Sequence, residues 1–355
     1  MEQDSRAKAQ DSGAKAPRWR GARPGARWTP DLPRFPLLDG ASPLQPIPRF
    51  GAAIGGGAEI WIKREDLLPL AFGGNKLRNL EFLVGAALAE GADTLITTGR
   101  RWSNHARLTA AAGARAGLAV HLVLSGPPLD TPGPNQLLDE LLGATVHVTA
   151  TDARAERTAR VERVAADLRA AGHRPYVIPT GGSGVVGAVG SVLAGLELAD
   201  QARDRGFRPD VVVLPTATGG TQAGLLVGIA LAGLATRVVG MAVAQPAAEL
   251  RIVVAGLVAD AADLAGLDPA LIGPIEIDDG QLGPGYGRQT EASREATRLL
   301  ARTEGILVDP IYTAKGLAGL IDMARSGALA GQAVVFWHAG GTPGIFEPLD
   351  DDGPA

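Results

Sequence analysis

Residues 211–243, VVVLPTATGGTQAGLLVGIALAGLATRVVGMAV, decide the fold. The segment 211–214 is an apolar run of strand length, and a Gly-rich turn separates it from 221–234, which has the length and apolar content of a buried helix. A second apolar run follows at 238–243. Fully apolar strands joined by a helix are typical of a parallel sheet whose two faces are both covered. This unit therefore predicts an α/β fold.

The same alternation of strands and helices extends on both sides of this unit and forms two series. We expect two open parallel-sheet α/β domains, the larger made of residues 30–90 and 208–355 and the smaller of residues 91–207. Further strands are predicted at 59–64, 94–98, 120–124, 145–149, 175–178 and 334–337, and further helices at 76–90, 105–116, 135–142, 153–171, 186–205, 247–264, 291–303 and 314–325.

Composition excludes several classes of function. The chain of 355 residues has no Cys and a net charge of −4. Without Cys there is no disulfide framework, no thiol nucleophile and no Cys-ligated zinc, and the five His are not spaced as metal ligands, so we expect no metal. A small negative charge opposes binding to nucleic acid or to an anionic membrane. We expect a cytoplasmic protein, since a reducing cytosol suits such a chain.

The N-terminal segment differs from the rest. Residues 1–29 are rich in Ala, Gly, Pro, Arg and Lys without apolar periodicity, which predicts a disordered basic arm. The arm lacks the apolar stretch of a secretory signal. The longest apolar run, 223–235, falls short of the roughly 20 residues that a membrane helix needs, so we expect no membrane span.

Gly-rich turns supply the first indication of a ligand. They are GGNK at 73–76, GGSG at 181–184, TGGT at 218–221 and GGTPG at 340–344. A turn of this kind before a helix presents backbone N–H groups that bind phosphate. The motifs of nucleotide sites are missing, because no Gly-Lys-Ser/Thr and no G-x-G-x-x-G after a strand are present. A phosphate cradle at 218–221 is therefore predicted to hold some other phosphorylated group.

Lysine is scarce, and one lysine stands at an unusual place. Outside the arm the chain has only Lys63, Lys76 and Lys315. Lys76 follows Gly-Gly-Asn and opens a predicted helix, where the positive end of the helix dipole lowers the pKa of an amine. A lysine with a lowered pKa suits Schiff-base chemistry. A phosphate cradle with such a lysine suggests pyridoxal 5′-phosphate (PLP) as cofactor, although either feature alone also fits an ordinary turn or surface lysine.

Seven short segments carry a wider pattern: IKRED at 62–66, GGNK at 73–76, SNHAR at 103–107, TGGT at 218–221, GYG at 285–287, DPIYT at 309–313 and HAGGTPG at 338–344. In this order they resemble the D-cysteine desulfhydrase / 1-aminocyclopropane-1-carboxylate (ACC) deaminase family. That family belongs to the fold-type II PLP enzymes, which are similar to the tryptophan synthase β-subunit. The resemblance covers about residues 30–348. It implies PLP in the cleft between the two domains, a small amino acid as substrate and a homodimer.

The resemblance also implies catalytic roles for particular residues. Lys76 would bind PLP covalently and move the Cα proton of the substrate. Ser103 would hold the substrate carboxylate, and Tyr286 and Tyr312 would face the substrate. The other residues expected to contact the substrate are Asn104, His105 and Trp102.

For the cofactor, the resemblance implies that Asn104 binds the 3′-oxygen of PLP. Thr218, Gly219, Gly220 and Thr221 would cradle its phosphate. The remaining residues expected to contact PLP are Asn75, Thr313 and Thr342.

Two departures bear on the reaction. Where the deaminase branch has Glu after the tyrosine of its Asp-Pro-x-Tyr motif, this chain has Thr313. A neutral hydroxyl would leave the pyridine nitrogen unprotonated, which favours β-elimination over ring opening. The family usually has Gln before Ser-Asn-His, and this chain has Arg100-Arg101-Trp102 instead. An indole here would reshape the substrate pocket, unless Trp102 points away into packing.

Four hypotheses for the function follow. The first is a PLP-dependent lyase that performs α,β-elimination on D-cysteine or a related β-substituted amino acid, giving pyruvate, ammonia and sulfide. The second is an ACC deaminase. The third is a biosynthetic β-replacement enzyme on the same scaffold. The fourth is a catalytically silent PLP-binding or small-ligand regulatory protein, which the intact Lys76 and Ser103 oppose.

Overall fold

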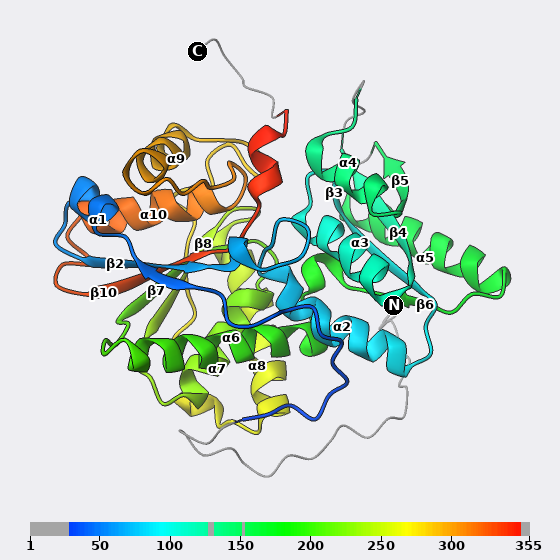
Figure 1. The fold of residues 1–355 in the computed structure, drawn as a ribbon, viewed down its shortest axis with the longest axis horizontal. Coiled ribbons are helices and arrows are strands. Elements are labelled where there is room, and N and C mark those ends of the chain that lie inside the picture. The colour runs from blue at the N-terminus through cyan, green and yellow to red at the C-terminus, as the bar shows by residue number, and fades with distance from the viewer. Residues whose placement is uncertain (1–27, 127–130, 151–152, 349–355) are drawn as a thin grey trace, which may run out of the picture.

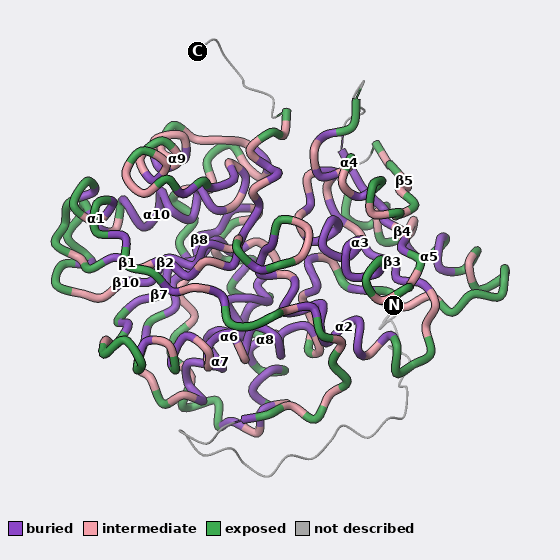
Figure 2. The backbone as a smooth tube through the Cα atoms, in the orientation of Figure 1, coloured by how far each residue is buried: buried purple, intermediate pink, exposed green. Residues whose placement is uncertain are grey.

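The computed structural model describes residues 28–126, 131–150 and 153–348. These residues form two α/β units, each built on its own sheet, with the larger unit at the left and bottom of Figure 1 and the smaller at the right. Buried residues fill the interior of both units and exposed residues cover the outer helices (Figure 2).

The larger sheet has six strands in the order β1-β2-β10-β7-β8-β9. All neighbouring pairs are parallel except β1 and β2, which are antiparallel. The two central strands are mainly apolar and almost completely buried because helices cover both faces of the sheet. The strands are β1 (Leu44–Pro46), β2 (Glu59–Arg64), β7 (Val211–Thr216), β8 (Arg237–Ala242), β9 (Glu276–Asp278) and β10 (Ala333–His338).

Three helices pack on each face of this sheet, as Figure 1 shows. One face carries α1 (Pro48–Ile54), α9 (Glu291–Glu304) and α10 (Thr313–Arg325). The other carries α6 (Val185–Asp204), α7 (Gly220–Leu231) and α8 (Ala247–Ala265).

The smaller sheet has four parallel strands in the order β5-β4-β3-β6. They are β3 (Thr94–Arg100), β4 (Ala119–Ser125), β5 (Thr145–Thr149) and β6 (Pro175–Val177). The helices α2 (Lys76–Ala89) and α3 (Asn104–Ala116) share a core with one face of this sheet, and α4 (Pro134–Leu141) packs against α3. The helix α5 (Arg154–Ala170) covers the other face. Short 3-10 segments occur at Glu65–Leu67, Thr180–Gly182, Pro269–Leu271 and Thr342–Phe346.

The predicted α/β class with two parallel sheets is confirmed, and every predicted strand and helix is present within a few residues of its expected bounds. Two short strands and one short α-helix were not predicted: β1, β9 and α1. The antiparallel pairing of β1 means that the larger sheet is parallel except at one edge.

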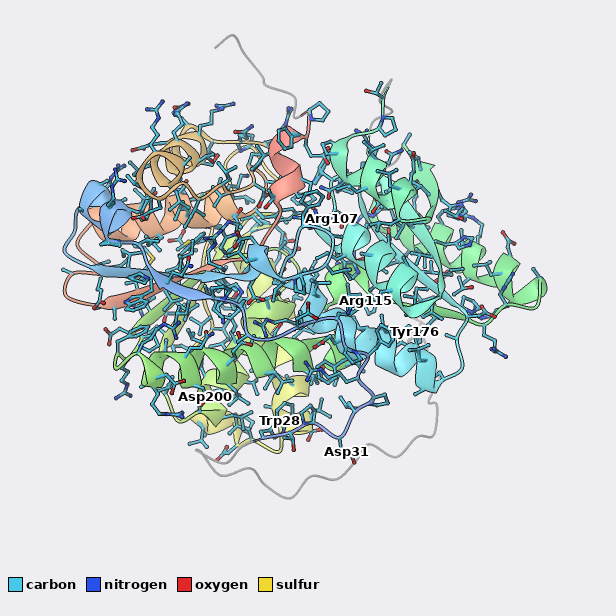
Figure 3. All side chains as sticks on the ribbon, in the orientation of Figure 1. Trp28, Asp31, Arg107, Arg115, Tyr176 and Asp200 are labelled. Atoms are coloured by element: carbon cyan, nitrogen blue, oxygen red, sulfur yellow. The ribbon has the colours of Figure 1, made fainter. Side chains whose placement is uncertain are left out.

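The packing of α6 and of Trp28 differs from the predicted domain limits. The helix α6, placed by sequence in the smaller unit, packs on α7 and α8 in the core of the larger one. The helix α2 contacts both α6 and α3, so it joins the two units. Trp28, expected in the disordered arm, is 8% exposed and belongs to the larger core (Figure 3). The remainder of the predicted arm lies outside the described residues.

One helix of the described residues, α6, is long and apolar enough by composition to cross a membrane. In the fold 61% of its most apolar window is buried, and it packs between α2 and α7. These contacts account for its apolar sequence as that of a core helix.

Candidate active site

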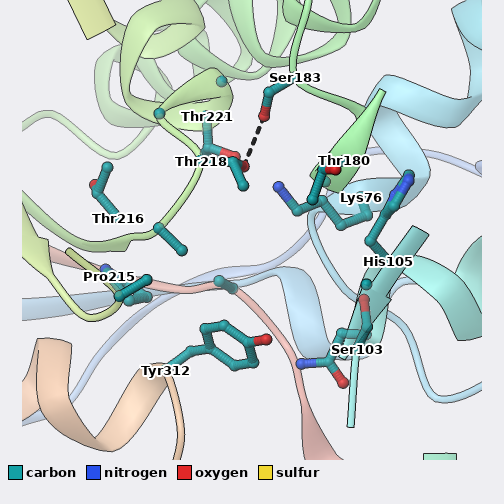
Figure 4. Close-up of a pocket in the computed structure, with 18 of the residues that line it drawn as sticks. Lys76, Ser103, His105, Thr180, Ser183, Pro215, Thr216, Thr218, Thr221 and Tyr312 are labelled. Carbon is teal, nitrogen blue, oxygen red and sulfur yellow. Dashed lines mark hydrogen bonds between the residues drawn. The ribbon is translucent and has the colours of Figure 1, made fainter. Parts of the chain in front are cut away.

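A cavity of about 430 Å³ lies where the carboxyl ends of β3 and β7 meet the first turns of α2, α3 and α7. Ligand sites in open α/β sheets lie at this end of the strands. Figure 4 draws 18 of the residues that line the cavity. The residues predicted from sequence that line it are Asn75, Lys76, Ser103, Asn104, His105, Thr218, Gly219, Gly220, Thr221, Tyr286 and Tyr312.

Lys76 is the first residue of α2 and lines the cavity. Its position is set by Asn75, whose backbone N–H donates to Ala339 O at 3.0 Å and whose Nδ2 donates to Thr221 Oγ1 at 2.8 Å. The second bond ties the start of α2 to the start of α7. Burial lowers the pKa of Lys76 to about 8, and no charged partner among the described residues offsets this shift. The amine is therefore more readily neutral, and more nucleophilic, than an exposed lysine.

The other two lysines outside the arm are bound elsewhere. Lys63 is fully buried, and its Nζ donates to Ser42 O at 2.7 Å and to Glu197. Lys315 Nζ donates to the backbone oxygens of Leu282 and Gly285, at 2.7 and 2.9 Å, and so holds the loop that carries Tyr286. Neither lines the cavity. Of the lysines in the described part of the chain, Lys76 alone faces this site.

The turn between β7 and α7 has the geometry of an anion cradle. Gly219 has φ +82°, a conformation that favours glycine, and α7 begins at Gly220 with its first N–H groups unpaired within the helix. Thr218 Oγ1 and Ser183 Oγ are 2.7 Å apart and hydrogen-bonded, as the dashed line in Figure 4 shows. A Cβ on Gly220 would lie 2.7 Å from Ser183 Oγ. Only glycine therefore keeps this space, and the cradle fits the phosphate of PLP beside Lys76.

The Ser-Asn-His turn forms a second wall. Ser103 is the N-cap of α3, and its Oγ accepts from Ala106 N at 3.2 Å. Asn104 Oδ1 accepts from Arg107 Nη1 at 2.9 Å, which orients the amide. His105 Nε2 is 3.0 Å from Thr97 Oγ1. Burial, followed by the charge of Lys76, lowers the pKa of His105 to about 3, so this ring is neutral.

Tyr286 and Tyr312 reach the cavity from two separate loops, and their hydroxyl groups are hydrogen-bonded to each other. Burial raises the pKa of both phenols, that of Tyr312 well above its ordinary value. Both are neutral at physiological pH and can donate or accept a proton through a hydrogen bond. Tyr176 lies on β6 and does not line the cavity.

Three residues predicted to contact the ligands do not line the cavity: Trp102, Thr313 and Thr342. The Trp102 ring packs beside Tyr286, with centroids 6.0 Å apart, and its contact with the substrate stays a prediction. The Thr313 hydroxyl donates to the Asp309 carboxylate, which also accepts from the backbone N–H of Tyr312 at the start of α10. Thr342 begins the segment Thr342–Phe346. Contacts of Thr313 and Thr342 with PLP stay predictions.

Several lining residues were not predicted. Ser183 lies in a Gly-rich turn that the sequence showed, and a Cβ on Gly181 in that turn would meet Thr218 Oγ1 at 2.5 Å. The sequence showed both Gly-rich turns, at 181–184 and 218–221, but not that they pack against each other. Arg100, Arg154 and Arg157 also line the cavity.

Two histidines lie close together in the structure, although their spacing in the sequence did not indicate a pair. His121 on β4 and His147 on β5 are distant in sequence, yet His121 Nδ1 and His147 Nε2 are 3.0 Å apart and the two rings are stacked. The described residues hold no cluster of three or more His, Cys, Asp or Glu able to bind a metal.

A cradle for phosphate beside a buried lysine defines the site of a PLP enzyme. The chain belongs to the family described as "Pyridoxal-phosphate dependent enzyme", whose model matches residues 36–340. It is 40% identical over 321 residues to a D-cysteine desulfhydrase from Salmonella newport (strain SL254), covering 89% of this chain and 96% of that protein. A relative from Pyrococcus abyssi (strain GE5 / Orsay), named for ACC deaminase, is 38% identical over 315 residues, covering 89% and 93%.

Solved structures agree with this assignment. A crystal structure of an "ACC deaminase homologue" has a TM-score of 0.83 and 36% identity, covering 89% of this chain and 94% of that one. The crystal structure of a threonine deaminase, at 21% identity and TM-score 0.59, shares the fold, covering 84% of this chain and 89% of its own. The predicted family, the fold class, the PLP cofactor and the class of PLP-dependent lyase are confirmed.

Proposed function

We propose that this enzyme performs α,β-elimination on D-cysteine or a related β-substituted amino acid. With D-cysteine, one water is consumed and pyruvate, ammonia and hydrogen sulfide are released. The observation that carries the proposal is Lys76, the one cavity-facing lysine of the described chain, held beside the Thr218–Gly220 turn. The D-cysteine desulfhydrase relative, matched over 96% of its length, supports the substrate.

The residues of the site have distinct roles in binding and in proton transfer. PLP, when bound, supplies the electron sink that stabilises negative charge at Cα. Thr218 and the N–H groups at the start of α7 would hold its phosphate, and Asn104 its 3′-oxygen. Ser103 and the N-terminus of α3 would hold the substrate carboxylate. Lys76, with its lowered pKa, would take the proton from Cα.

Departure of the thiol needs a further proton donor. The Cβ–S bond breaks with both electrons on sulfur, and a neutral hydroxyl nearby would stabilise or protonate the departing hydrosulfide. Tyr286 and Tyr312 are neutral and linked by a hydrogen bond, so we assign this role to the pair.

A panel of amino acids tests the proposal. The PLP-loaded enzyme is offered the two enantiomers of cysteine and of β-chloroalanine, together with ACC, and 2-oxo acid and sulfide are measured. Pyruvate from D-cysteine and D-β-chloroalanine, with equimolar sulfide from the former, is the expected result. Absence of 2-oxo acid from every β-substituted amino acid contradicts the proposal.

ACC deaminase is the second candidate, because the solved structure of an ACC deaminase homologue superposes with a TM-score of 0.83. Thr313, where that branch carries Glu, opposes it. Release of 2-oxobutanoate from ACC at a rate comparable to pyruvate release from D-cysteine would favour this candidate.

The resemblance also leads us to propose a cytoplasmic homodimer. Light scattering of the purified enzyme tests the dimer, and fractionation of the source cells tests the location.

A further inference from the structure

The cavity carries more positive charge than PLP and an ordinary amino acid require. Its described lining includes Lys76, Arg100, Arg154 and Arg157, whereas Asp and Glu are missing from that described set. The Thr218–Gly220 turn accounts for a phosphate and the Ser103 turn for one carboxylate. The three arginines have no role in the proposed reaction.

The arginines converge although they come from distant segments. Arg100 is the last residue of β3, and Arg154 and Arg157 lie in the first turn of α5, so all three lie at the carboxyl edge of the smaller sheet. Arg157 Nη1 donates to Ser125 Oγ at 3.2 Å, at the end of β4. Arg100 and Arg157 line the same cavity, and burial, and next the like charge of Arg157, lowers the pKa of Arg100.

The group lies on the tyrosine side of the cavity. Arg100 Cζ is 5.8 Å from the centroid of the Tyr286 ring, and Tyr286 is hydrogen-bonded to Tyr312. The phosphate cradle is built by a different pair, Thr218 and Ser183. In Figure 4 that pair lies in the upper part of the view and Tyr312 in the lower part. Arg100 thus lies beside one of the two tyrosines assigned to the leaving group.

The Trp102 ring contacts the guanidinium group of Arg100 and helps to position it. Arg100 Cζ lies 5.9 Å from the centroid of the Trp102 ring, so the guanidinium rests against both Trp102 and Tyr286. A Cβ on Gly287 would lie 2.7 Å from Trp102, so the glycine leaves room for the indole. Arg100 and Trp102 both lie in the segment that departs from the family pattern, and their side chains pack against each other.

We propose that Arg100 and Arg157, assisted by Arg154, form a subsite for a second anionic group on the substrate. The substrate class is a small amino acid whose side chain ends in a phosphate, sulfonate or carboxylate. Both arginines also take part in other polar interactions, so the substrate anion would join or replace an existing partner. This inference deepens the proposed function, because it names the kind of side chain that the elimination would act on.

The chemistry of the elimination agrees with such a subsite. With O-phosphoserine, the Cα–H bond and the Cβ–O bond break, the oxygen keeps both electrons, and inorganic phosphate leaves. The remaining fragment takes up one water and gives pyruvate and ammonia. Negative charge grows on the leaving group as the Cβ–O bond breaks, and guanidinium groups beside it stabilise that charge.

Two matched pairs of compounds test the subsite on the PLP-loaded enzyme. O-Phosphoserine and O-acetylserine, each as both enantiomers, differ mainly in the charge of the leaving group, and kcat/KM is measured from pyruvate release. Aspartate and asparagine are nearly isosteric and lack a good leaving group, so their dissociation constants are measured by titrating the PLP absorbance. We expect at least one enantiomer to show a preference for the anionic member of each pair of about tenfold or more.

The variants Arg100→Met and Arg157→Met should reduce that preference about 10- to 100-fold, chiefly through KM and the dissociation constant. Arg115→Met is the charge-matched control, since Arg115 is exposed in the last turn of α3 and does not line the cavity (Figure 3). Trp102→Leu should lower the preference with little change in the thermal midpoint, and Trp102→Phe should restore much of it. PLP content and thermal midpoint check that each variant is folded.

The outcomes separate this inference from the proposed function. Pyruvate from D-cysteine or O-acetylserine, without preference for either anionic compound, overturns the subsite and leaves the elimination standing. Arg100-dependent binding of aspartate over asparagine, without 2-oxo acid from any compound, supports the subsite and overturns the elimination. A preference that survives in both Arg100→Met and Arg157→Met also overturns the inference.

Discussion

The hydroxyl groups of Tyr286 and Tyr312 are hydrogen-bonded to each other, although the two residues lie on loops 26 positions apart in sequence. Lys315 holds one of these loops through the backbone oxygens of Leu282 and Gly285. The other loop leads directly into α10. These two anchors bring two neutral phenols to the same cavity.

Removing either phenol should slow elimination without releasing PLP. Tyr286→Phe and Tyr312→Phe each lose the linked hydroxyl pair, and we expect kcat/KM to fall about 10- to 100-fold, in line with general acid catalysis. Because the hydroxyls act together, the double variant should be little worse than either single one. Tyr176→Phe is the control, because Tyr176 does not line the cavity (Figure 3). Additive losses in a double-mutant cycle would contradict a shared role.

The cradle should lose PLP affinity when its space is filled. In Gly220→Ala the new Cβ would lie 2.7 Å from Ser183 Oγ, which forces the Ser183–Thr218 pair or the turn to move. We expect the dissociation constant for PLP, measured by titrating the apoenzyme, to rise about tenfold or more. Gly256→Ala is the matched control, because nothing lies within 4 Å of its added Cβ. Equal affinity in the two variants would show that the turn does not hold the phosphate.

Capture of PLP by the apoenzyme should depend on pH through Lys76. Only the neutral amine attacks the aldehyde, and burial lowers the pKa of Lys76 to about 8. The amine loses its proton as pH rises, so the capture rate should climb through about pH 8 and level off well below the ordinary lysine pKa of 10.5. Stopped-flow absorbance measures this rate. A rate that continues to rise about tenfold per unit up to about pH 10 would mean that Lys76 keeps the pKa of an exposed lysine.

The local sequence predicted the strands and helices well, and the reasons differ between elements. The run 211–214 is apolar at every position, so its burial in a central strand followed directly. The edge strand β1 has three residues, two of them exposed, and ends in Pro46, so it carried no pattern to detect. Its pairing with β2 depends on contacts between separate segments of the chain.

In the site too, local sequence patterns could be predicted, whereas contacts between distant segments could not. Lys76 was found because Gly73, Gly74 and Asn75 mark a tight turn in the sequence itself. Arg154 and Arg157 were missed because they begin a charged helix, in which they resemble its other arginines. Only the packing of α5 against the sheet brings them beside Arg100. The burial of Trp28 was equally invisible, since its partners come from distant helices of the larger core.

Truncation tests where the folded chain begins. Removal of residues 1–27, which lack apolar periodicity, should leave the thermal midpoint and kcat unchanged. Trp28→Ala should instead destabilise the protein by about 3 kcal/mol, because a buried indole leaves the core. Thermal or denaturant unfolding compares the two proteins. A large loss from the truncation alone would show that residues before Trp28 contribute to folding or catalysis.

PLP is expected to be bound covalently to Lys76. Borohydride reduction of the PLP-loaded enzyme, followed by proteolysis and mass spectrometry of the peptides, locates the pyridoxyl group directly. We expect modification of Lys76, complete loss of the label in Lys76→Ala, and unchanged labelling in Lys315→Met, since Lys315 bonds to loop carbonyls and does not line the cavity. A pyridoxyl group on Lys63 or Lys315 in the unmodified enzyme, or on no lysine at all, would contradict it.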